Sequence, residues 1–242
     1  MTIKQIIKGL LPARVLAFKN KLDDLERLAP LADRCCPVCG YVGHFDIWFG
    51  PDIIRDNTCP RCDSHPRLRL FWLWFAGARE KMVEPILHFA PERALRERLS
   101  AIYQDYRTAD LSHDAHLKLN IEAIDLPSES VETVICNHVL EHVDDTKAMR
   151  ELHRILRPGG RLICSVPLIE GWSTTYENDA VASDAERALH FGQSDHVRFY
   201  GQDFRERLRR AGFTGIDEIT AHGPEVVKYS LLRGEKFFLC AK

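Results

Sequence analysis

Apolar strand-like segments alternate with helical segments between residues 85 and 166, and this alternation constrains the fold more than any other feature of the 242-residue chain. The strand-like segments are PILHF, YRTADL, ETVIC and RLICSV, and the helical ones cover 92–100 and 145–156. This order predicts a parallel sheet, because the crossover between parallel strands is usually a helix. A further helix over 202–211 precedes strands over 215–221 and 236–241, which we expect to pair as an antiparallel hairpin at the sheet edge.

Two C-P-x-C elements near the N-terminus have the spacing of a zinc ribbon. They are Cys36/Cys39 and Cys59/Cys62. Two residues between sulfurs let one tight turn place both thiolates on the same ion, and four thiolates fill a tetrahedral Zn²⁺ without leaving a position for water. We therefore predict a structural zinc site, for which Cys35, His44 and His65 are alternative ligands.

The chain divides into three segments. Residues 1–31 have apolar positions at helical spacing and are predicted to form amphipathic helices, either packed on the rest of the protein or, given their basic residues, lying on a membrane surface. Residues 32–66 hold the zinc ribbon, and residues 67–242 form the α/β domain. We expect a cytoplasmic protein, because the N-terminus lacks the apolar core of a signal peptide and no run approaches ~20 apolar residues.

Three motifs between residues 124 and 167 carry a family resemblance. Leu126-Pro127 precedes a strand, N-H-V-L-E-H follows it at 137–142, and L-R-P-G-G at 156–160 precedes the next strand. The segment resembles class I S-adenosylmethionine-dependent methyltransferases of type 11. The resemblance implies a Rossmann-like, seven-stranded methyltransferase sheet with helices on both faces, and S-adenosylmethionine as the methyl donor. Pro158-Gly159-Gly160 itself is expected to stop a helix and turn the chain into a strand.

The resemblance also implies which residues contact the nucleoside part of the cofactor. Asp110, at the end of the strand YRTAD, stands where an acidic side chain accepts hydrogen bonds from both ribose hydroxyls. Leu111 follows it and is included in the predicted site. Glu122-Ala123 matches an acidic-Ala pair near the adenine, with Asn120 as an alternative.

The methionine part is expected to lie between the first loop and the strand before residue 137. Asn137 and His138 lie just past the apolar strand VETVIC, where ligands of open α/β sheets bind. The first loop departs from the family, which usually has an acidic residue and G-x-G where this chain has L-H-F-A-P-E. We expect Ala90 to replace the first glycine in part and Pro91 to open a helix whose N–H groups face the ligand. The contacts predicted in this loop are His88, Phe89 and Ala90.

A long polar insertion over residues 168–201 is predicted to cap the site of methyl transfer. Within it, His196 beside Asp195 is a plausible general base for an oxygen acceptor. The alternative is that these two residues and Arg198 only anchor the insertion through hydrogen bonds. His142, one turn beyond His138, is interpreted as an orienting or packing residue.

The composition favours a small acceptor over a macromolecule. With 33 Lys+Arg against 35 Asp+Glu the net charge is −2, which gives no general attraction to nucleic acid. The leading hypothesis is methyl transfer to oxygen of a small-molecule or sugar-containing (glycan) acceptor. One alternative is an RNA or protein methyltransferase whose ribbon grips the substrate, with Arg61, Arg67 and Arg69 as phosphate contacts. Another is a scaffold that has lost the cofactor.

Overall fold

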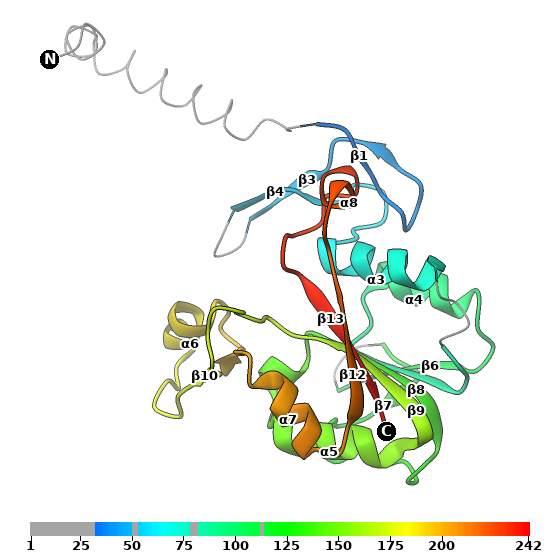
Figure 1. The fold of residues 1–242 in the computed structure, drawn as a ribbon, viewed down its shortest axis with the longest axis vertical. Coiled ribbons are helices and arrows are strands. Elements are labelled where there is room, and N and C mark those ends of the chain that lie inside the picture. Colours follow the sequence, from blue (N-terminus) through cyan, green and yellow to red (C-terminus); the bar gives the residue numbers. More distant parts are fainter. Residues whose placement is uncertain (1–31, 50–52, 78–81, 112–113) are drawn as a thin grey trace, which may run out of the picture.

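The computed structural model describes residues 32–49, 53–77, 82–111 and 114–242 (Figure 1). The amphipathic helices predicted for residues 1–31 lie outside the described residues. No helix of the described part is long and apolar enough to cross a membrane.

A seven-stranded sheet forms the centre of the protein, in the order β12-β13-β9-β8-β5-β6-β7. Its first five members along the chain pair in parallel, and the last two run antiparallel at one edge, as predicted. The strands are β5 (Ile86–Phe89), β6 (Tyr106–Asp110), β7 (Leu117–Lys118), β8 (Val131–Asn137), β9 (Leu156–Ser165), β12 (Thr214–Thr220) and β13 (Lys236–Ala241).

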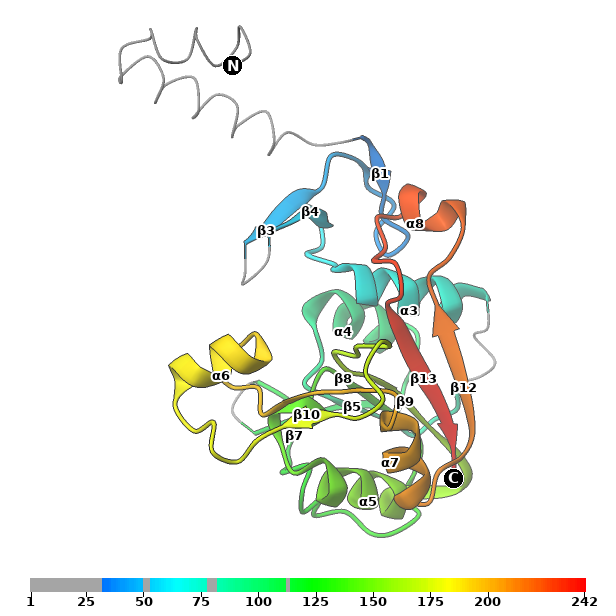
Figure 2. The same ribbon diagram turned by 60° about the vertical axis from the view of Figure 1, so that its left-hand side comes forward.

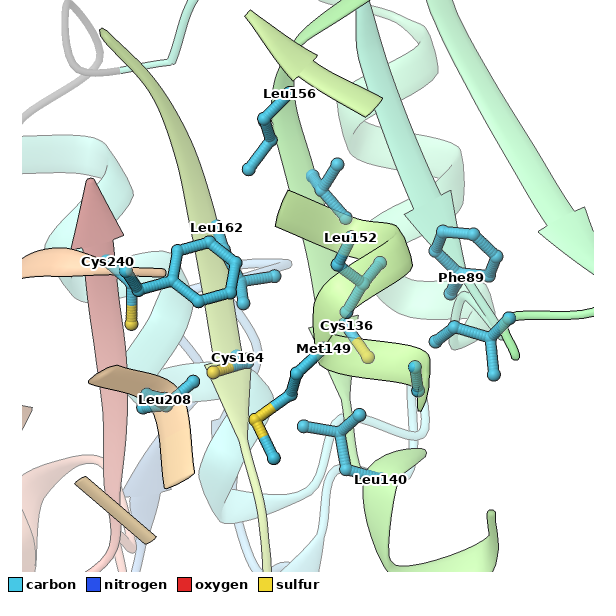
Figure 3. Close-up of a cluster of buried hydrophobic side chains, with 14 of the residues drawn as sticks. Phe89, Cys136, Leu140, Met149, Leu152, Leu156, Leu162, Cys164, Leu208 and Cys240 are labelled. Atoms are coloured by element: carbon cyan, nitrogen blue, oxygen red, sulfur yellow. The ribbon is translucent and has the colours of Figure 1, made fainter. Parts of the chain in front are cut away.

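Helices cover both faces of this sheet (Figure 2). One face carries α3 (Pro66–Gly77) and α4 (Arg93–Ser100), and the other carries α5 (Asp145–Ile155) and α7 (Phe204–Arg210). Successive strand side chains point to opposite faces, so each strand contributes to both cores. Figure 3 shows the core under α5 and α7, in which Met149, Leu152 and Leu208 join Cys136, Leu162 and Cys164.

The junction between α5 and β9 differs from the prediction. The helix ends at Ile155, and Pro158-Gly159-Gly160 lies inside the strand that follows, where the pairing with β8 shifts register. Pro158 disfavours the helical conformation for the residue before it, which explains the earlier helix end. A Cβ on Gly160 would lie 2.9 Å from the Glu132 carbonyl oxygen, so glycine permits the close strand contact.

The cysteine-rich module consists of two small antiparallel hairpins beside α3. They are β1 (Arg34–Cys35) with β2 (Val42–Gly43), and β3 (Asp46–Phe49) with β4 (Ile53–Thr58). Phe45 of this module belongs to the same buried cluster as Phe71 of α3 and Ile135 of β8. The module and the sheet therefore share one hydrophobic core. The short helix α8 (Pro224–Lys228), between β12 and β13, lies beside β1 (Figure 1).

The insertion over residues 168–201 folds into a hairpin and a helix that project from the sheet (Figure 2). The elements are β10 (Tyr176–Glu177), α6 (Asp184–Phe191) and β11 (Arg198–Phe199). Buried Arg198 anchors them, because its guanidinium donates to the carbonyls of Leu140 and Val143 and pairs with Glu177 at 3.0 Å. Arg198 thus has the anchoring role that the sequence left as an alternative.

Candidate functional site

The carboxyl ends of β5 and β8 carry two residues with left-handed backbone. Ala90 has φ +44° and His138 has φ +50°. This conformation costs a non-glycine residue about 1 kcal/mol and is concentrated at functional sites. Ala90 adopts a conformation that glycine takes more easily. Its N–H donates to the carbonyl of Ala109.

The helix after this loop begins without a side-chain cap. Glu92 precedes α4 in an extended conformation, and its side chain makes no capping hydrogen bond. Its carboxylate instead pairs with Arg67 of α3 at 3.2 Å. Backbone N–H groups at the start of a helix favour negatively charged or polar ligands.

In the structure, the side chain of His88 lies away from the predicted cofactor site. His88 alternates with Leu87 and Phe89 along β5, which places it on the face covered by α3 and α4. It is fully buried, with Nδ1 2.8 Å from the Tyr106 hydroxyl. Phe89 is buried in the opposite core, so this strand offers the site its backbone and Ala90.

Because His88 is buried, the free energy of unfolding should fall by about 2 kcal/mol between pH 7 and pH 5 through this group alone. Burial lowers the pKa of folded His88 to about 3. Below pH 6.5 the unfolded chain therefore binds a proton that the folded chain does not, and stability falls with pH. Urea unfolding should show a smaller pH dependence for His88→Asn, which keeps a partner for Tyr106, and an unchanged one for exposed His190→Asn. Equal slopes in all three proteins would contradict the assignment.

The residues predicted for the nucleoside lie along the ends of β6 and the turn after β7. Asp110 ends β6, and Leu111 beside it is 53 % exposed. The turn is closed by the Ala123 N–H, which donates to the carbonyl of Asn120. Glu122 accepts from the Asp144 N–H at 2.9 Å and so joins this turn to the start of α5.

The two residues predicted after β8 face different surroundings. Asn137 is buried and its Oδ1 accepts from the Ser165 hydroxyl. His138 is partly exposed and lies 3.1 Å from the Glu141 carboxylate and 3.9 Å from that of Glu235. Burial alone would lower the pKa of His138, but these two carboxylates raise it to about 9, so the ring is charged at neutral pH.

A cavity of about 490 Å³ opens next to His138. Its walls come from the cysteine-rich module, from α3, from the end of α6 and from the segment before β13. The lining residues are Trp48, Ile54, Asn57, His65, Pro66, Arg67, His138, Pro167, Phe191, Gly192, Gln193, His196, Phe199, Leu232 and Glu235. The module and the insertion thus enclose one space together, which no motif in the sequence indicated.

The Asp195 carboxylate contacts a histidine other than its neighbour in the sequence. The Asp195 carboxylate lies 3.2 Å from Nδ1 of His142, whereas Nδ1 of His196 lies 3.1 Å from the carbonyl of Phe191. The rings of His142 and His196 are in edge contact, with centroids 4.7 Å apart. Glu141 is fully buried beside them. Sequence reasoning missed Glu141, although titratable residues at 138, 141 and 142 were the available signal.

The four predicted zinc ligands converge. Sγ of Cys36 lies 3.7 Å from that of Cys62, and Sγ of Cys39 lies 3.6 Å from that of Cys59. A tetrahedral zinc with Zn–S bonds of about 2.3 Å separates its sulfurs by about 3.8 Å. The donor set therefore fits Zn²⁺ in type and spacing, without Cys35 or a histidine.

All three arginines considered for phosphate binding contact other groups of the protein, Arg61 through a 3.4 Å hydrogen bond to the Cys39 carbonyl. Arg69 is fully buried and donates to backbone carbonyls, so it cannot reach a nucleic acid. Arg67 pairs with Glu92 and lines the cavity. Arg61 lies over the Tyr41 ring at the surface. These three arginines therefore do not form a phosphate-binding surface beside the cysteines.

Comparisons of the sequence with known proteins find methyltransferases. Residues 87–164 match the type 11 methyltransferase domain family. The chain is 29 % identical over 137 residues to a ubiquinone/menaquinone biosynthesis C-methyltransferase of Pectobacterium carotovorum, a match that covers 51 % of this chain and 53 % of that protein. The Escherichia coli K12 protein of the same name is 28 % identical over 136 residues, with 50 % and 53 % covered. The chain spans about half the length of these curated relatives.

Solved structures with a similar fold are more distant in sequence. An S-adenosylmethionine-dependent methyltransferase from Mesorhizobium loti has a TM-score of 0.45 and 14 % identity, covering 69 % of this chain and 96 % of that one. A Thermotoga maritima protein described as a possible histamine N-methyltransferase has a TM-score of 0.44 and 14 % identity, covering 72 % and 96 %.

Proposed function

Starting from the class I S-adenosylmethionine-dependent methyltransferase domain that this chain carries, we propose that the protein transfers a methyl group from S-adenosylmethionine to an oxygen of a small-molecule or sugar-containing acceptor. One observation carries the proposal. The cavity of about 490 Å³ lies beside His138, at the end of β8, and is walled by the insertion and the cysteine-rich module. Its volume suits a small ligand.

The donor is expected to lie along the ends of β5, β6 and β8. Ala90 lets the backbone of the first loop turn beneath the cofactor, and the Asp110 carboxylate accepts hydrogen bonds from the ribose hydroxyls. Leu111 offers exposed apolar surface next to the ribose and adenine. The charged His138 would hold the carboxylate of the methionine part through a charge-assisted hydrogen bond.

We assign zinc a structural role in holding one wall of the acceptor cavity. Four thiolates leave no coordination position for substrate. The ion instead fixes the hairpins that carry Trp48, Ile54 and Asn57 to the cavity. The proposal divides the chain into an N-terminal segment (1–31), the zinc ribbon (32–66) and the methyltransferase domain (67–242). The insertion over residues 168–201 of that domain would cap the substrate.

Oxygen is the proposed acceptor atom because the cavity is lined by groups that bind and ionise hydroxyls. His65 and His196, whose pKa values are lowered by burial, line it and can accept a proton, whereas the charged His138 can only donate. Burial lowers the pKa of His196, so its ring is neutral near pH 7 and can accept a proton. The curated relatives are named as C-methyltransferases, which makes an activated carbon the competing acceptor in a substrate screen.

Asp110→Ala should weaken S-adenosylmethionine binding about 100-fold, because it removes two charge-assisted hydrogen bonds to the ribose. Calorimetric titration of the zinc-loaded chain with S-adenosylmethionine and S-adenosylhomocysteine measures this directly. We expect a parent affinity in the micromolar range, about −8 kcal/mol. Asp125→Ala, an exposed aspartate in the same part of the chain, should bind like the parent. If the parent binds neither nucleoside, the proposed function is rejected and the scaffold hypothesis takes its place.

A further inference from the structure

We propose that Glu141, His142 and His196 form a binding site for a divalent metal ion beside the acceptor cavity. One ligand atom from each residue lies within 4.8 Å of those of the other two. Two imidazoles and one carboxylate are a donor set that binds zinc, manganese or iron and leaves coordination positions open. The site is separate from the four cysteines and rests on different elements.

The buried carboxylate is the first observation that points to a cation. The side chain of Glu141 is 0 % exposed, and neither of its oxygens has a hydrogen-bond partner among the described residues. The nearest charged group is Nδ1 of His138, 3.1 Å from Oε1. The charged His138 ring offsets part of the cost of burying this carboxylate, and a second cation at Oε2, which has no hydrogen-bond partner among the described residues, would offset more of it.

The orientation of the two histidines is the second observation. Nδ1 of His196 is held by the carbonyl of Phe191 at 3.1 Å, and Nδ1 of His142 is held by the carboxylate of Asp195 at 3.2 Å. Each ring therefore keeps Nε2 for another ligand. Histidines that bind metal almost always have the other nitrogen fixed by a carbonyl or carboxylate in this way. Asp195 accordingly acts as a positioning residue for His142.

The fold brings the ligands together from two segments. Glu141 and His142 lie on the short 3-10 helix Leu140–His142, which follows β8. His196 comes from the insertion, just before β11. The backbone of the two segments is joined by a hydrogen bond from the Val197 N–H to the Glu141 carbonyl, 2.9 Å long. The site would thus form only when the insertion is docked over the sheet.

The ion would act on the acceptor, and this use of the site rests on the proposed function. His196 lines the cavity, so an acceptor hydroxyl there can reach an open coordination position. With Nδ1 on the Phe191 carbonyl and Nε2 on the ion, His196 would not act as the base, and the ion would take over activation of the hydroxyl. Binding to a divalent ion lowers the pKa of a hydroxyl and lets its proton pass to water. The oxygen then forms a bond to the methyl carbon while the carbon–sulfur bond of the donor breaks, and its electron pair stays on sulfur as the neutral thioether.

Manganese binding to the zinc-loaded full chain tests the site without reference to activity. Mn²⁺ prefers oxygen and nitrogen donors and binds thiolates weakly, so it should leave the zinc in place. Electron paramagnetic resonance should show one Mn²⁺ bound per chain. Glu141→Gln and His196→Asn should each weaken binding at least tenfold; the asparagine can keep the contact to Phe191 while removing Nε2. Asp195→Ala should weaken it severalfold by removing the carboxylate from His142, whose Nδ1 would keep only the Asp195 carbonyl at 3.3 Å.

The control is His190→Asn, an exposed histidine of the insertion whose Nδ1 contacts the Tyr176 hydroxyl. It should bind Mn²⁺ like the parent. Thermal unfolding of every variant verifies folding, and exposed Asp195 gives a variant whose folding is least affected. No Mn²⁺ on the parent, or equal affinity in all folded variants, overturns the site. S-adenosylmethionine binding is measured on the same samples. If the parent binds Mn²⁺ but not S-adenosylmethionine, the proposed function is rejected and the metal site remains. If it binds S-adenosylmethionine but not Mn²⁺, only the metal site is rejected.

Discussion

Cys59→Ser should lose stoichiometric zinc and lower the thermal midpoint by roughly 10 °C or more, which corresponds to a loss of several kcal/mol for a protein of this size. Structural zinc contributes roughly 10 kcal/mol or more of binding energy to small modules that lack their own core. Cys59 is fully buried, and its sulfur is 3.6 Å from that of Cys39, so oxygen in its place leaves the tetrahedron incomplete. Zinc analysis of the purified protein and thermal unfolding give the two readouts.

The effect should extend beyond the cysteine-rich module. Cys36 and Phe45 belong to the buried cluster that includes Phe71 of α3 and Ile135 of β8. The module also supplies part of the cavity wall, so acceptor turnover should fall further than S-adenosylmethionine binding does. The matched control is Cys35→Ser, one residue before Cys36 and outside the set of four. Retention of zinc and stability by Cys59→Ser, or equal loss in both variants, would contradict the assignment.

The sheet could be predicted from the sequence because its hydrophobic pattern is periodic. The segments PILHF, YRTADL, ETVIC and RLICSV all became parallel strands, and the last two strands formed the expected antiparallel edge. The convergence of the four cysteines was equally predictable, since a spacing of two residues already fixes which sulfurs can share an ion. Both predictions depend on local patterns.

The placement of individual side chains depends on tertiary contacts. The position of His88 in the first loop suggested a cofactor contact, but strand alternation turns its side chain into the core. The adjacency of Asp195 and His196 suggested a pair, but the chain geometry sends their side chains to different partners. The shared cavity between the module and the insertion depends on packing between segments far apart in the sequence, which no spacing rule reports.

Arg69→Met should lower the free energy of unfolding by about 3–5 kcal/mol, the cost typical of breaking a buried charged network. Arg69 is fully buried in α3. Its guanidinium donates to the carbonyls of Tyr229 at 2.7 Å, Ser230 at 2.6 Å and Ser64. It thereby joins α3 to the cysteine-rich module and to the segment between α8 and β13. Methionine would fill the space but leave the half-buried carbonyls of Tyr229 and Ser230 without these donors, while the Ser64 carbonyl would keep the N–H of Cys59.

The positive charge of Arg69 would also offset part of the negative charge of zinc bound by the four cysteines. Four thiolates and one Zn²⁺ carry a net charge of about −2, and burial lowers the pKa of Arg69 to about 10 while the cysteines Cys36, Cys59 and Cys62 oppose that shift. Arg69→Met should therefore weaken zinc retention against a chelator as well as stability. Arg69→Lys, which keeps the charge but not the three-carbonyl contact, should restore zinc retention more than stability. Exposed Arg61→Met should change the unfolding free energy by less than about 0.5 kcal/mol. If Arg69→Met loses stability but holds zinc like the parent, the carbonyl contacts act alone and the electrostatic coupling is wrong.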